Sequence, residues 1–327
     1  MSKTNSRSKK SKRKNKYKVK NWPEYNQTLK QRGSLTIWIS REALKKWNYQ
    51  GPARRGAQYK YSDLAIETLL TLKVVFHLQF RQVEGLMHSI VELMKLDLEI
   101  PDYTTLSRRQ KRLQIQLPIR HRKEPIHLVI DSTGVKIFGD GEWKVRQHGY
   151  SKRRTWRKLH LAVDEATGEI QAAELTTNNI DDADEIKPLL SQTQNLIEAV
   201  SADGAYDKTK SYIALLNKAE QQKNSIQINI PLRKDAKIVR HGNSSEPPVA
   251  RDQNLRLIRK HGRKRWKELS EYHRRSIAEN VMFRYKTIIG PTLKARTLEA
   301  QRVEAIIGCT ILNRMTVLGF PQSYKAQ

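Results

Sequence analysis

The sequence predicts an α/β protein in which a mixed sheet flanked by helices follows a smaller all-helical region. Between residues 61 and 112, apolar residues recur three and four positions apart, as in amphipathic helices. Beyond residue 125 they fall into short runs and alternating stretches typical of strands, and long helical segments return after residue 270. A chain of 327 residues can hold a small and a large domain together.

The charge indicates the kind of partner. The chain has 62 Lys and Arg against 33 Asp and Glu, a formal net charge of +29, while 38% hydrophobic residues still permit a core. Such an excess favours a polyanion, with DNA or RNA the usual one and an anionic membrane surface the alternative. Residues 1–20 hold ten Lys and Arg and no acid, which predicts a disordered basic tail.

Cysteine content and hydropathy exclude several classes of protein. Cys309 is the one cysteine of the chain, which excludes an internal disulfide and a zinc finger and favours a core position. No apolar stretch approaches the roughly 20 residues that span a bilayer, and the basic N-terminus lacks the apolar part of a signal peptide. We therefore expect no membrane association and a cytoplasmic location, at the nucleoid of a bacterial host.

Residues 21–118 predict a helical DNA-binding domain. Helices are expected over about 64–78 and 83–94, and a third begins after Asp102, a plausible N-cap. The third carries Arg108 and Arg109, which we expect to face outward and bind DNA as in a helix-turn-helix module. Helical triplets without any DNA-binding role are also common, so this alternative stays open.

Residues 125–320 are expected to form a larger α/β domain, the candidate catalytic domain. Strands are expected at 126–130, 156–163, 169–176, 199–202 and 226–231, with a turn at 164–168 and helices at 181–196 and 208–220. A polar, basic insertion follows at about 233–268, then a helix from about residue 270 and a last one over 298–318. The succession matches the ribonuclease H-like fold, although it would also suit other mixed α/β domains.

Two aspartates stand where strands are expected to end. Asp131 closes the run LVID and Asp203 closes VSAD, and small residues follow each of them. Hard carboxylate oxygens are the ligands of Mg²⁺, and two such ions about 3.5–4 Å apart serve phosphodiester cleavage. An aspartate after a strand is also a common turn former or helix cap, so neither residue is decisive alone.

A third acid is expected on a helix. Tyr272, Arg275, Glu279 and Lys286 have offsets of 0, 3, 7 and 14, which place them within about 60° of arc on one helical stripe. Such a stripe can join a metal ligand to phosphate-binding groups. A solvated face with ion pairs between successive turns would have the same appearance.

These motifs together resemble the DDE-class transposases of bacterial insertion sequences, specifically the insertion-sequence-five family. The segment YHRRSIAENVMFRYK carries the family's Tyr, Arg, Glu and Lys spacing, while DSTG at 131–134 and DGAYD at 203–207 match the first two acids. NWPEYN at 21–26 and FRQVEGLM at 80–87 extend the resemblance over nearly the whole chain.

The resemblance implies a site, ions and a reaction. Asp131, Asp203 and Glu279 would bind two Mg²⁺ ions, with Mn²⁺ as an alternative, and would serve cleavage of DNA at the ends of the element and joining of the 3′-hydroxyl ends to target DNA. Arg275 and Lys286 would contact phosphates, and Tyr272 the end nucleotides. The partner would be double-stranded DNA, bound by a homodimer because two ends must be joined together.

Two further basic segments are candidate DNA contacts. The first, beside the expected cleft, contributes Lys144, Arg146, Lys152, Arg153, Arg154, Arg157 and Lys158. The second lies in the insertion and contributes Arg263, Lys264 and Arg265. A solvated hairpin is the alternative for the first segment.

Three other functions remain open at this point. A nuclease of the same fold without strand transfer would use the same acids, and a catalytically silent DNA-binding repressor could retain them. An RNA- or ribosome-binding protein would explain the charge but leave the acids unexplained.

Overall fold

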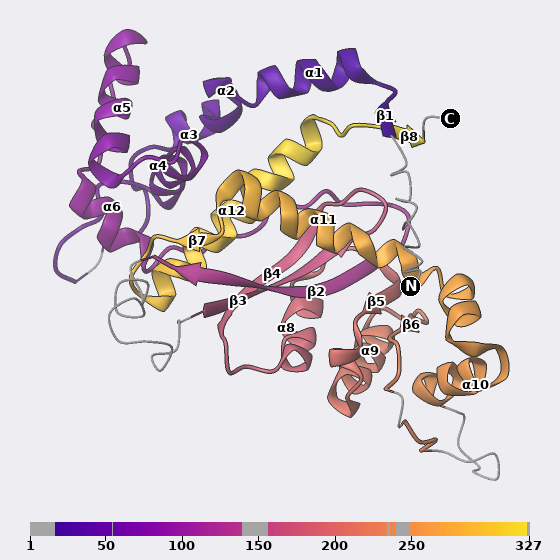
Figure 1. Cartoon of the computed structure of the whole chain (residues 1–327). Coiled ribbons are helices and arrows are strands. Elements are labelled where there is room, and N and C mark those ends of the chain that lie inside the picture. Colours follow the sequence, from indigo (N-terminus) through magenta and orange to yellow (C-terminus); the bar gives the residue numbers. More distant parts are fainter. Residues whose placement is uncertain (1–16, 54, 139–155, 234–235, 240–248, 326–327) are drawn as a thin grey trace, which may run out of the picture.

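The computed structural model describes residues 17–53, 55–138, 156–233, 236–239 and 249–325 (Figure 1). A mixed sheet with the strand order β4-β3-β2-β5-β6 forms its centre, and β7 pairs with the end of β2. The strands are β2 (Ile126–Ile137), β3 (Trp156–Asp164), β4 (Ile170–Thr177), β5 (Ile197–Ala202), β6 (Gln227–Asn229) and β7 (Thr292–Leu293). β3 is antiparallel to β2 and β4, whereas β5 is parallel to β2 and β6. The predicted mixed sheet is confirmed, and its order is that of the ribonuclease H-like fold.

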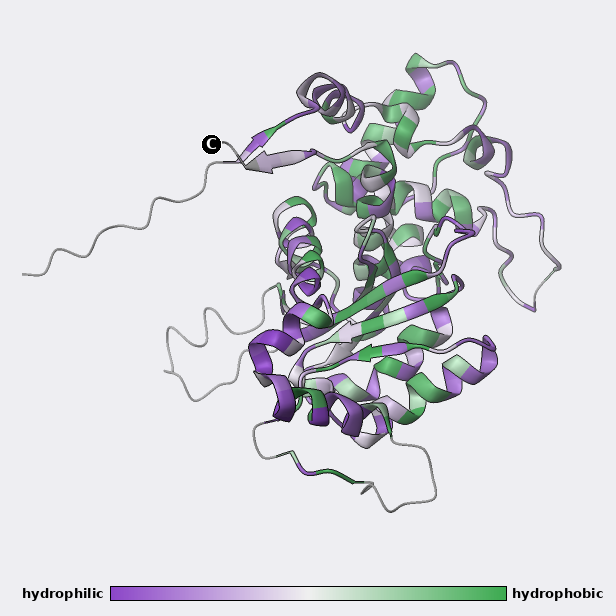
Figure 2. Cartoon of the chain, turned by 90° about the vertical axis from the view of Figure 1, so that its right-hand side faces the viewer, coloured by the Kyte–Doolittle hydropathy of each residue, from purple (hydrophilic) through white to green (hydrophobic). Residues whose placement is uncertain are grey.

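Helices cover both faces of the sheet because residues of β2 alternate between two cores. Leu128 and Ile130 pack with α8 (Ile186–Gln192) and α9 (Thr209–Gln221) on one face. Val129 and Val135 pack on the other face with α11 (Ser276–Arg284) and α12 (Leu298–Leu318) (Figure 1). Apolar residues accordingly gather on the strands and on the helices against them (Figure 2).

Helix α12 joins this sheet to the N-terminal helices. Its residues Ala305 and Cys309 belong to the core under α11, as predicted for the single cysteine. Ile307 and Ile311 belong to a separate core formed with the N-terminal helices. A helix that is apolar around most of its circumference is stable only when it is buried on several sides, so α12 holds the two parts of the chain together.

The N-terminal part is helical, as predicted. Its helices are α1 (Trp22–Gln31), α2 (Leu35–Trp38), α3 (Arg41–Lys45), α4 (Asp63–Val75), α5 (Phe80–Leu93) and α6 (Tyr103–Gln110). Asp102 caps α6, because its carboxylate accepts hydrogen bonds from the backbone N–H groups of Thr104 and Thr105. The short strands β1 (Tyr17–Val19) and β8 (Ser323–Lys325) pair, so the two ends of the described chain lie together (Figure 1).

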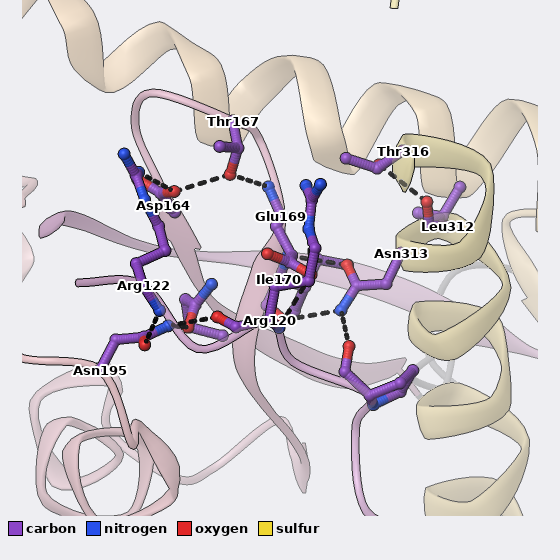
Figure 3. Close-up of polar contacts among 12 residues, drawn as sticks. Arg120, Arg122, Asp164, Thr167, Glu169, Ile170, Asn195, Leu312, Asn313 and Thr316 are labelled. Atoms are coloured by element: carbon purple, nitrogen blue, oxygen red, sulfur yellow. Dashed lines mark hydrogen bonds and ion pairs between the residues drawn. The ribbon is translucent and has the colours of Figure 1, made fainter. Parts of the chain in front are cut away.

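Polar contacts fasten the turn between β3 and β4 to its surroundings (Figure 3). The Asp164 carboxylate accepts hydrogen bonds from Arg122 at 2.8 Å and from Thr167 at 2.7 Å. At the start of β4, Asn313 of α12 bonds the backbone of Ile170 twice: its Oδ1 accepts from the N–H and its Nδ2 donates to the carbonyl, both at 2.8 Å. Asn313 therefore completes the backbone hydrogen bonding of β4 where no strand does.

Three predicted elements differ from the structure: the end of the strand at Asp131, the insertion, and the helix around Glu279. Asp131 does not end its strand, because β2 continues to Ile137 through pairs with β3 and β7. The insertion is not merely a polar stretch: α10 (Ala250–Leu269) forms there, bent at Gly262 with φ 79° and anchored by buried Trp266. Most of its charged residues face solvent, but Asp252 is buried and Arg251 pairs with Asp207.

The expected single helix around Glu279 is divided into three. A 3₁₀ turn η3 (Tyr272–Arg275) precedes α11, and a π-helical turn η4 (Tyr285–Ile289) follows it. Glu271, in the left-handed region with φ 50°, turns the chain from α10 into η3. The described helices include none that is long and apolar enough to cross a membrane.

We predict that Asn313→Ala lowers the free energy of unfolding by about 2–4 kcal/mol, because it leaves a buried N–H and a buried carbonyl of Ile170 without partners. Chemical denaturation followed by circular dichroism measures this. The control is Asn217→Ala, at an exposed position of α9, which should change the stability by less than about 0.5 kcal/mol. Equal effects of the two substitutions would contradict the role given to Asn313.

Candidate active site

Asp131 and Asp203 lie side by side because of the register between two parallel strands. Ile130 of β2 pairs with Ala202 of β5; Asp131 is the next residue of β2, and Asp203 directly follows the end of β5. Neighbouring strands are about 5 Å apart, so the two carboxylates start from adjacent positions. Asp131 also shares the strand face of Val129 and therefore points toward α11.

The two aspartates have different surroundings. Asp131 is half-buried, and its Oδ1 accepts a hydrogen bond from the Ser132 backbone at 2.9 Å. Burial raises the pKa of Asp131, Arg275 opposes this change, and the nearby Asp203 carboxylate adds to it. Asp203 caps the 3₁₀ turn η2 (Gly204–Tyr206) by accepting from the Ala205 N–H at 2.8 Å.

Arg275 connects the sheet to the helix at this place. Its Nη1 donates to Oδ2 of Asp131 at 2.6 Å, and its Nη2 donates to Oε1 of Glu279 at 2.7 Å. The Asp131 and Arg275 side chains are 13% and 19% exposed, whereas Glu279 is 59% exposed. One guanidinium therefore bridges a sheltered acid on β2 and an accessible acid on α11.

The Tyr272 side chain lies beside Arg275, where the charges of all three acids act on it. Burial raises its pKa, and the negative charges of Asp203, Asp131 and Glu279 add to this effect against that of Arg275. Its ring centroid lies 5.8 Å from the guanidinium carbon of Arg275. The structure thus brings together the predicted residues Asp131, Asp203, Glu279, Arg275 and Tyr272.

Lys286 stands apart from this group. It lies in the turn η4, about 10 Å along the helix axis from Glu279. The backbone N–H of Gly290 donates to the carbonyl of Tyr285 there, five residues back. Gly308 of α12 permits this packing, since a Cβ at that position would come within 2.7 Å of the Tyr285 ring. The position of Lys286 therefore depends on a close approach between α12 and the π turn.

The donor set of the site suits a divalent cation, since Asp131, Asp203 and Glu279 all offer carboxylate oxygens. Among the described residues, however, no three His, Cys, Asp or Glu side chains come together in a group that could hold an ion as they stand. The Arg275 guanidinium lies between two of the three acids. Arg275 therefore holds Asp131 and Glu279, while Asp203 accepts its hydrogen bond from the Ala205 N–H.

Apart from Arg109, the predicted DNA-binding residues fall into three groups. Lys144, Arg146, Lys152, Arg153 and Arg154 lie outside the described residues. Arg157 and Lys158 are half-buried on β3, where the Nε of Arg157 donates to Gln301 and the Nζ of Lys158 to the Ile180 carbonyl. The exposed residues are Arg108 on α6 and Arg263, Lys264 and Arg265 on α10.

The outward orientation predicted for Arg109 is wrong. Its side chain is 8% exposed, pairs with Asp63, donates to the Tyr61 carbonyl at 2.9 Å and lies 3.8 Å from the Tyr59 ring centroid. At the C-terminal end of α6 it faces the start of α4, because residues 106 and 109–110 form the buried side of that helix. Arg109 fastens α6 to the N-terminal core.

A basic cavity of about 460 Å³ lies between α6 and the segment before α4. Its cationic lining residues are Lys60, Arg108, Arg109, Lys111 and Arg112. Sequence reasoning missed Lys60 and the neighbouring Tyr59 as members of this surface. No pattern within the sequence brings residues 57–61 against α6; the buried contacts of Arg109 do.

Comparisons with known proteins identify the family of the chain. Two family models, each described as "Transposase DDE domain", match residues 30–140 and 122–314. The second match covers more than half of the chain, so the chain belongs to the DDE-domain transposases, enzymes that use divalent metal ions.

Among solved structures, the "Drosophila P element transposase strand transfer complex" is similar at 12% identity. The match covers 89% of this chain and 86% of that one, with a TM-score of 0.29.

We predict that Arg109→Ala lowers the free energy of unfolding by about 1–3 kcal/mol, since it removes a buried hydrogen bond and the packing on Tyr59. The exposed neighbour provides the control: Arg108→Ala should stay within about 0.5 kcal/mol of the parent protein. Urea denaturation of both variants measures the difference. A larger loss in the Arg108 variant would show that α6 is oriented otherwise.

Proposed function

We propose that this transposase binds the inverted-repeat ends of an insertion sequence of the insertion-sequence-five family, cleaves its DNA phosphodiesters and joins the 3′-hydroxyl ends to target DNA. The observation that supports this proposal most is the convergence of Asp131, Asp203 and Glu279 from two strands and a helix. The enzyme would act on double-stranded DNA at the nucleoid of its host.

Asp131, Asp203 and Glu279 would hold two Mg²⁺ ions, with Mn²⁺ as an alternative. Bound ions would supply activation of a water nucleophile and neutralisation of charge on the leaving oxygen. The chain itself contributes position: the parallel register fixes Asp131 beside Asp203, and the half-buried state of Asp131 keeps it in one orientation. Exposed Glu279 leaves the site open toward DNA.

Cations around the acids would bind the DNA backbone. Lys286 lies two helical turns beyond Glu279, and a duplex running along α11 would bring a phosphate within its reach. Tyr272, with its ring beside Arg275, is suited to contact the terminal nucleotides. Both roles require the DNA to run along α11.

The basic cavity beside α6 would provide a second contact with DNA, within the N-terminal helical domain proposed for residues 21–118. Arg108, Lys111 and Arg112 are exposed at its edge, and Arg109 behind them is fixed. Arg263, Lys264 and Arg265 on α10 would add a third surface. Since two element ends must be joined together, we propose that a homodimer forms on DNA.

We predict that Asp131→Ala, Asp203→Ala and Glu279→Ala each reduce Mn²⁺-dependent cleavage by more than the roughly 10–100-fold that loss of a residue supporting a metal ligand costs. DNA binding should persist, because each substitution removes a negative charge. Cleavage and gel-shift assays use fragments that carry the DNA flanking the reading frame. Glu198→Ala, which removes an exposed acid of β5, is the control and should cleave normally. Normal cleavage by any of the first three would refute the assignment.

We predict that the triple variant Arg108→Ala, Lys111→Ala, Arg112→Ala lowers the slope of log affinity against log salt concentration by up to about 3, because each lost phosphate contact contributes about 0.9. Fluorescence anisotropy over a salt series measures the slope. A matched triple variant replaces Lys45, Lys123 and Lys187, which are exposed but do not line the cavity. Equal slopes for the two triple variants would exclude the cavity as a DNA contact.

A further inference from the structure

The guanidinium of Arg275 occupies the position between the acids where a cation is needed. We propose that Arg275 is an exchangeable counter-ion of Asp131 and Glu279: a divalent cation displaces it from the carboxylates, and the freed guanidinium then binds a DNA phosphate. The inference rests on the proposed function in taking these acids as metal ligands. It adds that the cation binds first and that its binding frees Arg275 to bind DNA.

The geometry makes Arg275 a bridge rather than a partner of one acid. Its two terminal nitrogens bind carboxylates from different elements, at 2.6 Å on β2 and 2.7 Å on the first turn of α11. Arginine can do this because its nitrogens form a rigid planar fork. The neighbouring Arg274 shows the contrast, since it pairs instead with Glu165 and Glu271.

The charges explain why a cation belongs there. Asp131, Asp203 and Glu279 bring three carboxylates to one place, and Arg275 supplies one positive charge. Burial works against the charged form of Arg275, yet Asp131, Tyr272 and Glu279 together raise its pKa. The guanidinium therefore stays charged and offsets part of the repulsion between the acids.

The bridge and a metal ion compete for the same atoms. Mg²⁺ binds carboxylate oxygens at about 2.0–2.1 Å in a near-octahedral arrangement. A guanidinium donating to Oδ2 of Asp131 and Oε1 of Glu279 occupies the directions from which such an ion would approach. An ion that ligates both acids through these oxygens must therefore displace Arg275 from at least one of them.

A displaced Arg275 has a second class of partner available. Its fork matches the two oxygens of a phosphate as well as those of a carboxylate. The side chain is 19% exposed and lies beside the open, Glu279-bearing face of the site. Binding of an ion and binding of DNA then favour each other, because each relieves the same bridge.

The test measures Mn²⁺ affinity without DNA, by electron paramagnetic resonance of the free ion. We expect Arg275→Ala to bind Mn²⁺ more tightly than the parent protein, on the order of tenfold, because no bridge has to be broken. Arg275→Lys, which keeps the charge but lacks the planar fork that binds both carboxylates, should fall between them. Arg274→Ala removes the same charge one residue away and should match the parent within about twofold.

Two results would overturn the inference, and they differ in their meaning. Unchanged or weaker Mn²⁺ binding in Arg275→Ala, with binding abolished in Asp131→Ala, would show that Arg275 merely positions the acids, and the proposed function would stand. If no variant binds Mn²⁺, or if Asp131→Ala leaves Mn²⁺ binding unchanged, then these acids do not form a metal site. The proposed function would then fail as well. Thermal melts of the Ala and Lys variants confirm that each is folded.

A second titration tests whether the freed Arg275 binds a DNA phosphate. The Mn²⁺ titration is repeated with a short duplex already cleaved at the element end, so that no hydrolysis occurs. We expect the duplex to tighten Mn²⁺ binding at least about fivefold in the parent protein, a typical coupling, and much less in Arg275→Ala. Equal tightening in both proteins would show that Arg275 does not transfer to a phosphate.

Discussion

Mutual repulsion of three carboxylates, where β2, β5 and α11 meet, is the constraint on which the rest of this site depends. The sheet register forces Asp131 beside Asp203, and α11 brings Glu279 to the same place. Such a group is stable only with cations nearby. Arg275 meets this need within the chain, and the wider excess of basic residues provides an attractive surface for a polyanion.

The fold provides this arrangement by fixing backbones rather than by shaping a pocket. Asp131 gains its direction from strand alternation, and Glu279 from a helix that packs on the sheet through Ala278 and Val281. The most open part of the site is its helical side, where Glu279 is exposed. Such an open rim has room for a bulky substrate such as the duplex proposed above.

The sequence predicted those elements whose patterns are local. Apolar runs located the strands, and the boundaries of α12 agreed with the expected 298–318. What could not be predicted depends on distant contacts. Burial of Arg109 requires Tyr59 and Tyr61 to pack against α6. The helix break before α11 depends on the left-handed conformation of Glu271, and the break after it on the space that Gly308 leaves for the Tyr285 ring. The bridging role of Arg275 likewise appears only when β2 and α11 are side by side. The sequence spacing of Arg275 and Glu279 predicted only that these two residues share a helical face.

Helix α12 has a consequence for how the chain is made. Translation proceeds from the N-terminus, and domains generally fold as they emerge. Here the N-terminal helices and the sheet both lack the packing surface of α12 until residues 298–318 leave the ribosome. A prematurely terminated chain would expose apolar surface on both halves, which favours its aggregation or degradation. Few stable fragments able to occupy DNA without cutting it would then accumulate beside the full-length enzyme.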